Sequence, residues 1–470
     1  MDYSLLLPEL ILAVLGLVLI GVDLYAREKR AVAAVGVAGT LVALVAALGL
    51  FGQQAEIWNG TIRVDDFAVF FKVIFLVVLG LVFLFSNEYL ERREMKAGEF
   101  YILITFATLG AILMAASLNL ITIYLGLELL TLASYALTGM LKNDARSGEA
   151  SLKFFLVGAL TSGVILYGLS LLYGLSGSVH LLEIREALAA TANPGLAAVA
   201  SVLVIAGFGF KVAAVPFHMW APDAYDGAPT PVSAFLITAS EAAGFAALLR
   251  LLMVGLAPLT EQWQVAVAAL AAITMTYGNV TAIVQRRTKR MLAYSAIAQA
   301  GYVLVGVAVA TPASVSAMLF YLLAYALMTV GAFAVVIMLS NHVPSEEIED
   351  FKGLAQRSPA FALAMSILLL SLIGVPPTAG FLGKFTLFRA ATGGGFLWLA
   401  LLMVLNSVIS VPYYFGIIRN MYLKEAESPA PLPTRLGVKV ALAITVAGVF
   451  VLGLFPEPLV RFLGGAPLLP

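Results

Sequence analysis

The sequence predicts an all-α integral membrane protein of about fourteen transmembrane helices, with two inverted five-helix repeats that each contain a discontinuous helix. Three observations predict this class. Hydrophobic residues fill 61% of the 470 positions and charged residues only 11%, whereas a soluble domain carries about 25% charge. Apolar runs of membrane-spanning length recur along the whole chain. Two of these runs contain a proline close to a lysine.

Each expected span is a run of roughly 20 mostly apolar residues, the length that crosses the hydrocarbon core. The first run is interpreted as a span and not as a cleaved signal peptide, because no basic region precedes it and no small-residue cleavage site follows it. The run 359–392 is too long for one straight helix and contains Pro376 and Pro377, which predicts a break within it. The expected spans are 4–25, 31–51, 65–86, 99–116, 118–141, 150–174, 195–215, 230–254, 263–284, 290–309, 314–340, 359–392, 395–418 and 436–457.

The distribution of basic residues tests this topology. With the N-terminus outside, 19 of the 27 lysines and arginines fall in the inward segments 27–30, 92–96, 142–153, 286–290, 352–357 and 419–439. Five fall in outward segments, namely Arg63, Arg185, Arg250, Arg389 and Arg461, and three lie inside spans. Since cytoplasmic loops carry the excess of lysine and arginine, both termini are predicted on the outer face. The loops are too short to hold a catalytic domain.

Composition also excludes several classes of site. The absence of cysteine excludes disulfides, thiolate metal sites and iron–sulfur clusters on this chain. The three histidines are far apart, which argues against haem or copper, and a formal charge of zero argues against nucleic-acid binding. No cofactor is therefore expected on this polypeptide.

Ionisable residues inside a membrane cost several kcal/mol and indicate function by default. Glu128 lies near the middle of its span, and Thr131, Tyr135 and Thr138 follow it at helical spacing, so these polar groups could line a water path. The alternative is a structural ion pair between helices. Lys211 lies five residues before Pro216; a broken helix at this depth lines a cavity or is buried in protein. A desolvated lysine there could exchange protons near neutral pH, unless it snorkels to the surface.

Two further buried charges are candidates. Lys384 follows the second break, Pro376-Pro377-Thr378-Ala379-Gly380, and the opened backbone beside it predicts a hydrated cavity. The alternative is a lysine that snorkels to the outer surface. Glu241 lies near the middle of the span 230–254, among small residues that permit close helix packing. It is either a proton-transfer group or a structural partner of Lys211.

Weaker candidates complete the set. Lys72 lies only two turns into its span, close enough to the surface to snorkel. His218 lies on the first break, where a lone histidine is either structural or functional. Ser295, Gln299 and Tyr302 fall on one helical face, as a water-wire lining or as interhelical hydrogen bonding.

The two broken helices occupy comparable positions in two successive five-helix segments, which is the sequence pattern of an inverted repeat with sites at the midplane. The expected segments are an N-terminal three-helix part (1–98), a first repeat (99–254), a second repeat (255–422) and a C-terminal helix (423–470).

Three motifs carry a family resemblance. Two stretches closely resemble the antiporter-like membrane subunits of respiratory complex I. They are 215–232, Val-Pro-Phe-His-Met-Trp-Ala-Pro-Asp-Ala-Tyr-Asp-Gly-Ala-Pro-Thr-Pro-Val, and 289–302, Lys-Arg-Met-Leu-Ala-Tyr-Ser-Ala-Ile-Ala-Gln-Ala-Gly-Tyr. The stretch 374–385, Gly-Val-Pro-Pro-Thr-Ala-Gly-Phe-Leu-Gly-Lys-Phe, looks most like subunit N of bacterial NADH-quinone oxidoreductase. The resemblance extends over essentially the whole chain.

The resemblance implies proton translocation driven by electron transfer elsewhere in a complex. The family's coupled glutamate and lysine match Glu128 and Lys211, and its lysine on the second broken helix matches Lys384. Two positions depart from the family pattern. Glu241 stands where the family usually has lysine, which reverses the charge but keeps a titratable group. Gln299 stands where the family often has histidine, and glutamine cannot store a proton.

The implied partners are the other membrane subunits of the complex, including neighbouring antiporter-like subunits, together with the lipid bilayer of the bacterial inner membrane. The chain lacks a G-x-G-x-x-G dinucleotide fingerprint that opens a helix after a strand, so NADH, FMN and the iron–sulfur clusters are expected on partner subunits. Two alternatives are a subunit of a multisubunit sodium/proton antiporter and a purely structural membrane anchor. The costly buried charges argue against the anchor.

Overall fold

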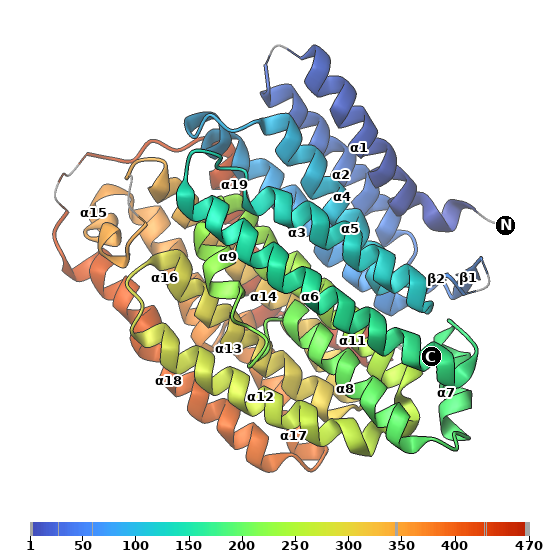
Figure 1. Cartoon of the computed structure of the whole chain (residues 1–470). Helices are drawn as coiled ribbons and strands as arrows, with labels where there is room; N and C mark the ends of the chain where they lie inside the picture. The colour runs from blue at the N-terminus through green and yellow to red at the C-terminus, as the bar shows by residue number, and fades with distance from the viewer. Residues whose placement is uncertain are drawn as a thin grey trace.

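The computed structural model describes residues 3–26, 28–58, 60–343, 346–426, 428 and 430–465. Figure 1 shows long helices lying side by side. They run between a left-hand end that holds α15 (Leu354–Arg357) and a right-hand end that holds α7 (Leu181–Ala189). A bundle of this kind satisfies its backbone hydrogen bonds within each helix, which the bilayer core requires.

Within the described residues, thirteen helices are long and apolar enough to cross a membrane. A further crossing consists of two shorter helices in series, α16 (Pro359–Ile373) and α17 (Ala379–Gly393), which confirms the predicted break in 359–392. The predicted set of about fourteen spans is therefore confirmed. The continuous crossings are η1–α1 (Tyr3–Leu6 and Leu7–Tyr25), α2 (Arg30–Leu48), α3 (Asp66–Arg92), α4 (Ala97–Ala116), α5 (Leu120–Thr138), α6 (Ala145–Ser176), α8 (Pro194–Lys211), the composite helix Thr230–Gly255, η4–α12 (Ala257–Leu259 and Thr260–Ile283), α13 (Thr288–Val309), α14 (Pro312–Ser340), α18 (Leu397–Leu423) and α19 (Leu436–Leu454).

The composite helix Thr230–Gly255 alternates between two hydrogen-bonding patterns. Its α-helical parts are α10 (Thr230–Phe235) and α11 (Glu241–Arg250), and each is followed by a π-helical turn, η2 (Leu236–Ser240) and η3 (Leu251–Gly255). Such turns often occur at functional sites. Glu241 directly follows the first of them.

Short elements lie between the crossings. The strands β1 (Ala55–Ile57) and β2 (Ile62–Val64) form an antiparallel hairpin with Ala55 opposite Val64, which the all-α prediction omitted. Besides α7 and α15, the short elements include α9 (Ala221–Gly227) and η5 (Ile348–Phe351), and α20 (Glu457–Gly465) follows the last crossing.

Polar side chains define several helix ends. Asp65 accepts a hydrogen bond from the backbone N–H of Ala68 at the start of α3, and Asn119 accepts from Ile121 at the start of α5. Thr311 and Ser314 form a capping box at the start of α14. These caps satisfy backbone donors that would otherwise lack partners, and they fix where the crossings begin.

Burial separates central from peripheral helices. In Thr230–Gly255 and in α13, every residue of the most hydrophobic 18-residue segment is buried inside the chain. In α6 and α19, only 28% of the corresponding segment is buried. Apolar side chains on the peripheral helices therefore face lipid or partner subunits. Polar groups on the two central helices lie in the protein interior.

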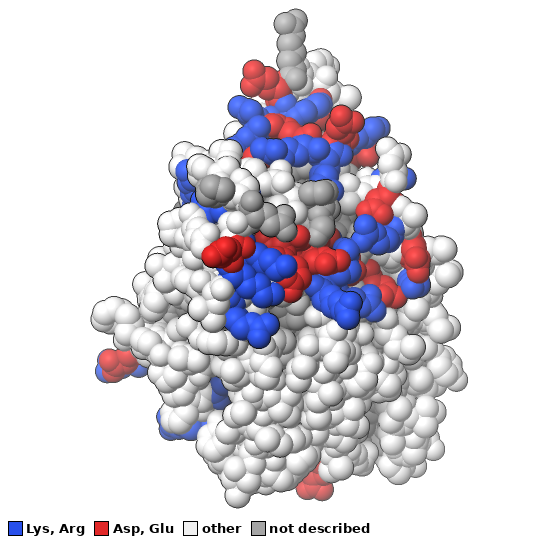
Figure 2. Space-filling view, turned by 90° about the vertical axis from the view of Figure 1, so that its left-hand side faces the viewer, with Lys and Arg blue, Asp and Glu red and all other residues white. Residues whose placement is uncertain are grey.

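The segments predicted on the inner side gather at one end of the molecule, along the upper left of Figure 1. Figure 2 looks onto this end and shows basic and acidic side chains clustered together. Ion pairs join its segments, including Arg435 with Glu91, Arg287 with Glu346 and Lys424 with Glu349. We call this end the charge-rich face. The clustering confirms which loops share a side, and the assignment of that side to the cytoplasm remains a prediction from the positive-inside rule.

Two basic residues, Arg250 and Arg27, stand apart from the predicted charge distribution. Arg250 was expected in an outward segment, but it is fully buried within Thr230–Gly255, where it pairs with Asp65 at 2.7 Å (Nη2 to Oδ1) and donates to the carbonyl of Ala115. A guanidinium is buried only when such partners are present, and these partners were not evident from the sequence. Arg27, counted with the inward segments, lies outside the described residues. The inverted-repeat relation and the four segment boundaries remain predictions.

Candidate functional site

Lys211 is the last residue of α8, four residues earlier than the predicted end of that span. The chain from 212 to 220 is not helical, as Pro216 predicts. Neighbouring side chains and carbonyls satisfy this opened backbone: Thr274 accepts from the N–H of Val215, and Trp220 donates to the carbonyl of Phe210. The break is therefore buried in protein, as membrane depth requires.

The Lys211 ammonium lies between two helices. Its side chain is 2% exposed and donates to Thr131 Oγ1 of α5 at 3.3 Å. On the other side it packs on Gly244 of α11, where an added Cβ would lie 2.9 Å from Lys211 Cγ. Thr131 and Gly244 each lie three residues after a predicted carboxylate, Glu128 and Glu241 respectively. Residues at that spacing share a helical face. Lys211 thus lies within about one helical turn of both positions.

Glu128 is only partly buried, and its carboxylate accepts a hydrogen bond from Ser162 of α6. Tyr124 extends this contact, with its hydroxyl 3.2 Å from Ser162 Oγ. Among the described residues, Lys211 forms no ion pair within 4.0 Å. The expected coupling of Glu128 with Lys211 is therefore not a direct contact, and it remains a prediction of coupling through Thr131 or water.

Glu241 is 2% exposed and accepts a hydrogen bond from Tyr225 Oη at 2.8 Å. Tyr225 lies on α9, immediately after the first helix break, so the break brings a hydroxyl to this carboxylate. The sequence motif 215–232 contains Tyr225, but nothing in its spacing identified it as the partner of Glu241. No ion pair joins Glu241 to Lys211 in the described part of the chain.

Lys384 lies on α17, shortly after the second break, and its ammonium reaches back to the broken end of α16. It is 8% exposed and donates to the carbonyls of Leu372 at 2.9 Å and Ile373 at 3.1 Å, with Ser407 Oγ at 3.3 Å. In a continuous helix these two carbonyls would accept from residues 376 and 377, which are prolines without an N–H. Lys384 therefore replaces both missing donors. The snorkelling alternative for Lys384 is wrong, because the lysine satisfies the broken end of α16.

The space beside Lys384 is more apolar than predicted. A groove of about 280 Å³ lies between α17 and α18, lined mainly by phenylalanine and aliphatic side chains. Phe385 and Val404 on its rim are exposed, so the groove opens at the outside of the bundle.

The α13 face that carries Ser295, Gln299 and Tyr302 forms one hydrogen-bonded network with the second break. Ser295 and Gln299 both contact Tyr414 Oη of α18, and Gln299 also donates to the Leu372 carbonyl at 3.3 Å. The Lys384 ammonium lies 4.4 Å from the centre of the Tyr302 ring. The predicted shared face is thereby confirmed, and it connects to Lys384 through the carbonyl of Leu372.

Side chains that the sequence analysis missed extend this network. Asn279 of α12 donates to Tyr302 Oη at 3.1 Å and to Asn406 Oδ1 at 3.3 Å, and it accepts from Tyr413 Oη at 2.8 Å. Tyr321 of α14 donates to Gln299. Asparagine in an otherwise apolar span was the available signal for Asn279 and Asn406, since an amide in the membrane needs partners.

Two residues that were predicted to line the proton path mainly pack against aromatic rings. Tyr135 packs edge-to-face on Phe154 and Phe155 with ring centres 4.7 and 5.6 Å apart. His218 is 7% exposed and packs against Tyr277 with ring centres 4.7 Å apart. Neither contact tests a role in proton transfer.

Lys72 lies outside this network. It is completely buried, and its Nζ lies 2.7 Å from Glu9 Oε1 of α1, so the expectation that it snorkels is wrong. Glu9 in the first span supplies the counter-charge, and no sequence pattern joins residues in spans one and three.

The charge-rich face includes Asp226, the residue that follows Tyr225. A pocket of about 290 Å³ there is lined by Tyr89, Asp226, Lys289 and Glu346, among others. Burial raises the pKa of Glu346, but Lys289 and Arg287 beside it outweigh burial and leave that pKa below its ordinary value. Similarly, burial raises the pKa of Asp223, and hydrogen bonds from Lys153 and Arg290 more than offset it. Both carboxylates therefore stay ionised at neutral pH. Asp223 joins α9 to Lys153 of α6 and Arg290 of α13, and Glu346 pairs with Arg287 and Lys289. Within the described ranges, no group of three or more His, Asp or Glu is arranged to hold a metal ion.

Comparison with known proteins identifies the family to which this chain belongs. Residues 117–410 match the family model described as NADH:quinone oxidoreductase/Mrp antiporter, TM. NADH-quinone oxidoreductase subunit N of Heliobacterium modesticaldum is 44% identical over 98% of this chain and 98% of that protein. Subunit N 2 of Symbiobacterium thermophilum is 43% identical over 98% of this chain and 96% of that protein. The chain belongs to the subunit N family of NADH-quinone oxidoreductases.

Solved structures agree. A chain of the respiratory complex I of Thermus thermophilus is 33% identical, covers 97% of this chain and 98% of its own length, and superposes with a TM-score of 0.83. A chain of an archaeal membrane-bound sulfane sulfur reductase is 26% identical over 100% of this chain and 98% of its own length, with a TM-score of 0.89. A chain of the Mrp complex from Dietzia has a TM-score of 0.88 at 21% identity, over 99% of this chain and 97% of its own length, which shows a shared fold alone.

Proposed function

We propose that this chain is the proton-translocating subunit N of a bacterial NADH-quinone oxidoreductase, and that it couples quinone reduction elsewhere in the complex to proton movement across the membrane. One observation supports this most strongly. Each of the two helix breaks carries a buried lysine, Lys211 and Lys384, and each lysine is hydrogen-bonded to polar groups of the interior. A buried lysine that can lose its proton suits a proton relay.

In this proposal each group has a defined role. Glu128 and Ser162 exchange protons with Lys211 through Thr131 or water. Glu241, held by Tyr225, gains or loses a proton in response to the charge on Lys211, although its own charge is opposite to that of the lysine usual in the family. The Ser295–Gln299–Tyr302 face carries the proton onward to Lys384. Gln299 cannot titrate, so it supports a water path and does not store a proton.

No direct hydrogen-bond chain between described residues joins Glu241 to Gln299, so the proposal requires water between them. His218 and Tyr135 are assigned to the lining of this path. Lys384 is the terminal loading group, and the proposed exit is on the face opposite the charge-rich face. This chain would then contribute to a translocase as a non-redox subunit.

The relatives support this function over the antiporter alternative. Proteins at 42–44% identity over nearly the full length are named NADH-quinone oxidoreductase subunit N, whereas likeness to the Mrp chain is limited to the fold. Because these relatives are subunits of a larger complex, the partners of this chain are the other subunits of such a complex. We place NADH, FMN and iron–sulfur chemistry on those partners, and we place both termini of this chain on the outer face of the inner membrane.

The test is an ion-specificity measurement on membrane vesicles that contain the complex. NADH with a quinone should drive proton uptake that persists when sodium is absent. Sodium/proton exchange without electron transfer would instead establish the antiporter alternative. A strain that lacks the chain, complemented with the wild-type sequence, is the matched control.

A further inference from the structure

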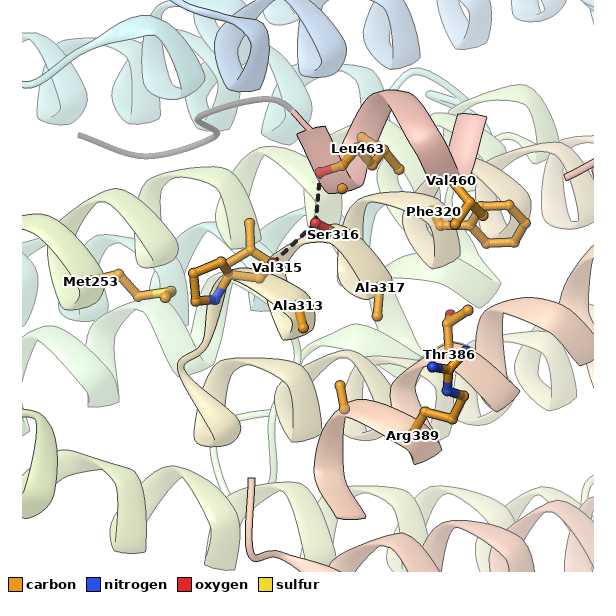
Figure 3. A pocket seen from close by; sticks show the side chains of 13 residues that line it. Met253, Ala313, Val315, Ser316, Ala317, Phe320, Thr386, Arg389, Val460 and Leu463 are labelled. Atoms are coloured by element: carbon orange, nitrogen blue, oxygen red, sulfur yellow. Dashed lines mark hydrogen bonds between the residues drawn. The ribbon is translucent and has the colours of Figure 1, made fainter. Parts of the chain in front are cut away.

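A pocket of about 510 Å³ lies at the end of the bundle opposite the charge-rich face. It is formed by the start of α14, the last turns of α17 and the short helix α20 (Figure 3). On α17, Thr386 and Arg389 lie across from Ala313 and Ala317 of α14, and Val460 and Leu463 close a third side. The volume is that of a small-molecule site.

The lining is apolar with one charged group. Its side chains include Met253, Val315, Ala317, Phe320, Val460 and Leu463, and Arg389 is the one charged residue among the described residues of the lining. The two hydroxyl groups of the lining already donate to backbone carbonyls. Ser316 donates to the carbonyl of Leu463 at 2.8 Å, and Thr386 donates to that of Gly383 at 2.9 Å. Arg389 therefore has to supply any strong polar contact to a ligand.

Arg389 is exposed, and no ion pair or side-chain hydrogen bond occupies its guanidinium within the described part of the chain. It lies four residues before the end of α17, where that helix leaves the membrane. An arginine at this depth can keep its head at the level of the lipid phosphates while its stem covers apolar surface. Guanidinium groups bind phosphate through two parallel hydrogen bonds.

We propose that this pocket binds one anionic phospholipid, with its phosphate on Arg389 and an acyl chain against Ala317, Phe320 and Leu463. Charge complementarity favours an anionic over a zwitterionic headgroup. A zwitterionic headgroup brings its own cation, and no acidic residue lines the described pocket to receive it. Glu457, the acid of the neighbouring α20, is already paired with Arg461. The bound lipid would join α14, α17 and α20, and α17 carries Lys384.

The test uses the purified complex in nanodiscs that contain a trace of phosphatidylglycerol with a photoreactive acyl chain. Labelling should concentrate on peptides that cover 312–320, 386–390 and 460–464. A phosphatidylcholine probe with the same acyl chain should label them several-fold less. Inorganic phosphate should not compete, because it lacks the acyl chain that the pocket would hold.

Arg389→Ala should reduce phosphatidylglycerol labelling of these peptides by roughly tenfold, as expected for the loss of a charge-assisted contact. Arg185→Ala is the matched control, because Arg185 is also exposed at this end of the molecule but lies outside the pocket. Ala313→Trp should fill the mouth of the pocket and block labelling while Arg389 is intact. Equal labelling in the Arg389→Ala variant and the wild type would overturn the proposal. A photoreactive side chain at Ala313 that crosslinks to a partner polypeptide and not to lipid would also overturn it.

Discussion

Lys384 combines a structural contact with a proposed chemical role, and two substitutions separate them. Its ammonium donates to the carbonyls of Leu372 and Ile373, which face prolines in place of their normal donors. Lys384→Met removes both hydrogen bonds. Gln299 still donates to Leu372, so the Ile373 carbonyl is the one left without its donor, at a cost of about 1–3 kcal/mol. We expect Lys384→Met to assemble with reduced thermal stability and to lose pumping.

Lys384→Arg keeps a cationic donor at the break but cannot release its proton at working pH. If Lys384 only satisfies the broken helix, Lys384→Arg should restore both stability and pumping. The proposed proton loading predicts that Lys384→Arg restores stability relative to Lys384→Met but pumps at least about tenfold more slowly than the wild type.

The assay is proton uptake by proteoliposomes that contain the purified complex, measured with a pH-sensitive dye, beside the thermal unfolding of the same preparation. Lys439→Arg, an exposed lysine on α19, controls for the exchange of lysine for arginine. Wild-type pumping by an assembled Lys384→Arg complex would refute the reasoning. Were Lys384→Arg as unstable as Lys384→Met, the donor argument for the break would be wrong.

Three further outcomes follow from the buried contacts. Glu241→Gln keeps the shape of the side chain and removes its titration, so pumping should fall sharply while assembly persists; full-rate pumping would make Glu241 structural. Tyr225→Phe removes the 2.8 Å hydrogen bond to Glu241 and should slow pumping less than Glu241→Gln does, and a larger loss would contradict the proposed order of importance. Glu9→Gln leaves Lys72 buried without its counter-charge and should destabilise the complex by about 3–5 kcal/mol, whereas Glu9→Gln with Lys72→Met should recover most of that loss. Additive effects in the double variant, measured by thermal unfolding, would show that the pair does not interact.

The fold could be predicted because lipid imposes simple rules on sequence. Span length, the excess of basic residues on one side and the prolines at 216 and 376–377 are local properties, and they gave the crossings and both breaks. Helix ends were less accurate. Lys211 ends α8 four residues before the predicted boundary, since the break begins where tertiary hydrogen bonds replace helical ones.

Partners could not be predicted in the same way. The sequence identified Glu241 and Lys384 as candidate buried charges and placed Lys72 inside a span, but pairing depends on helix packing, which leaves no periodic signal. Glu9 lies 63 positions before Lys72, and the Asn279 and Tyr413 that extend the second network are 134 positions apart. Lys384 is the exception. Its two acceptors could have been inferred from the prolines, because residues 372 and 373 lose their donors wherever 376 and 377 are proline.

The most direct test of the proposed proton path is the number of protons translocated per NADH oxidised by a complex that carries Lys211→Ala. The account predicts that the complex assembles, because Lys211 makes one hydrogen bond to Thr131 and no ion pair within 4.0 Å among the described residues. It also predicts that proton translocation and the coupled quinone reduction both fall at least about tenfold. An assembled Lys211→Ala complex with the wild-type ratio and rate would contradict the claim that protons pass through this lysine.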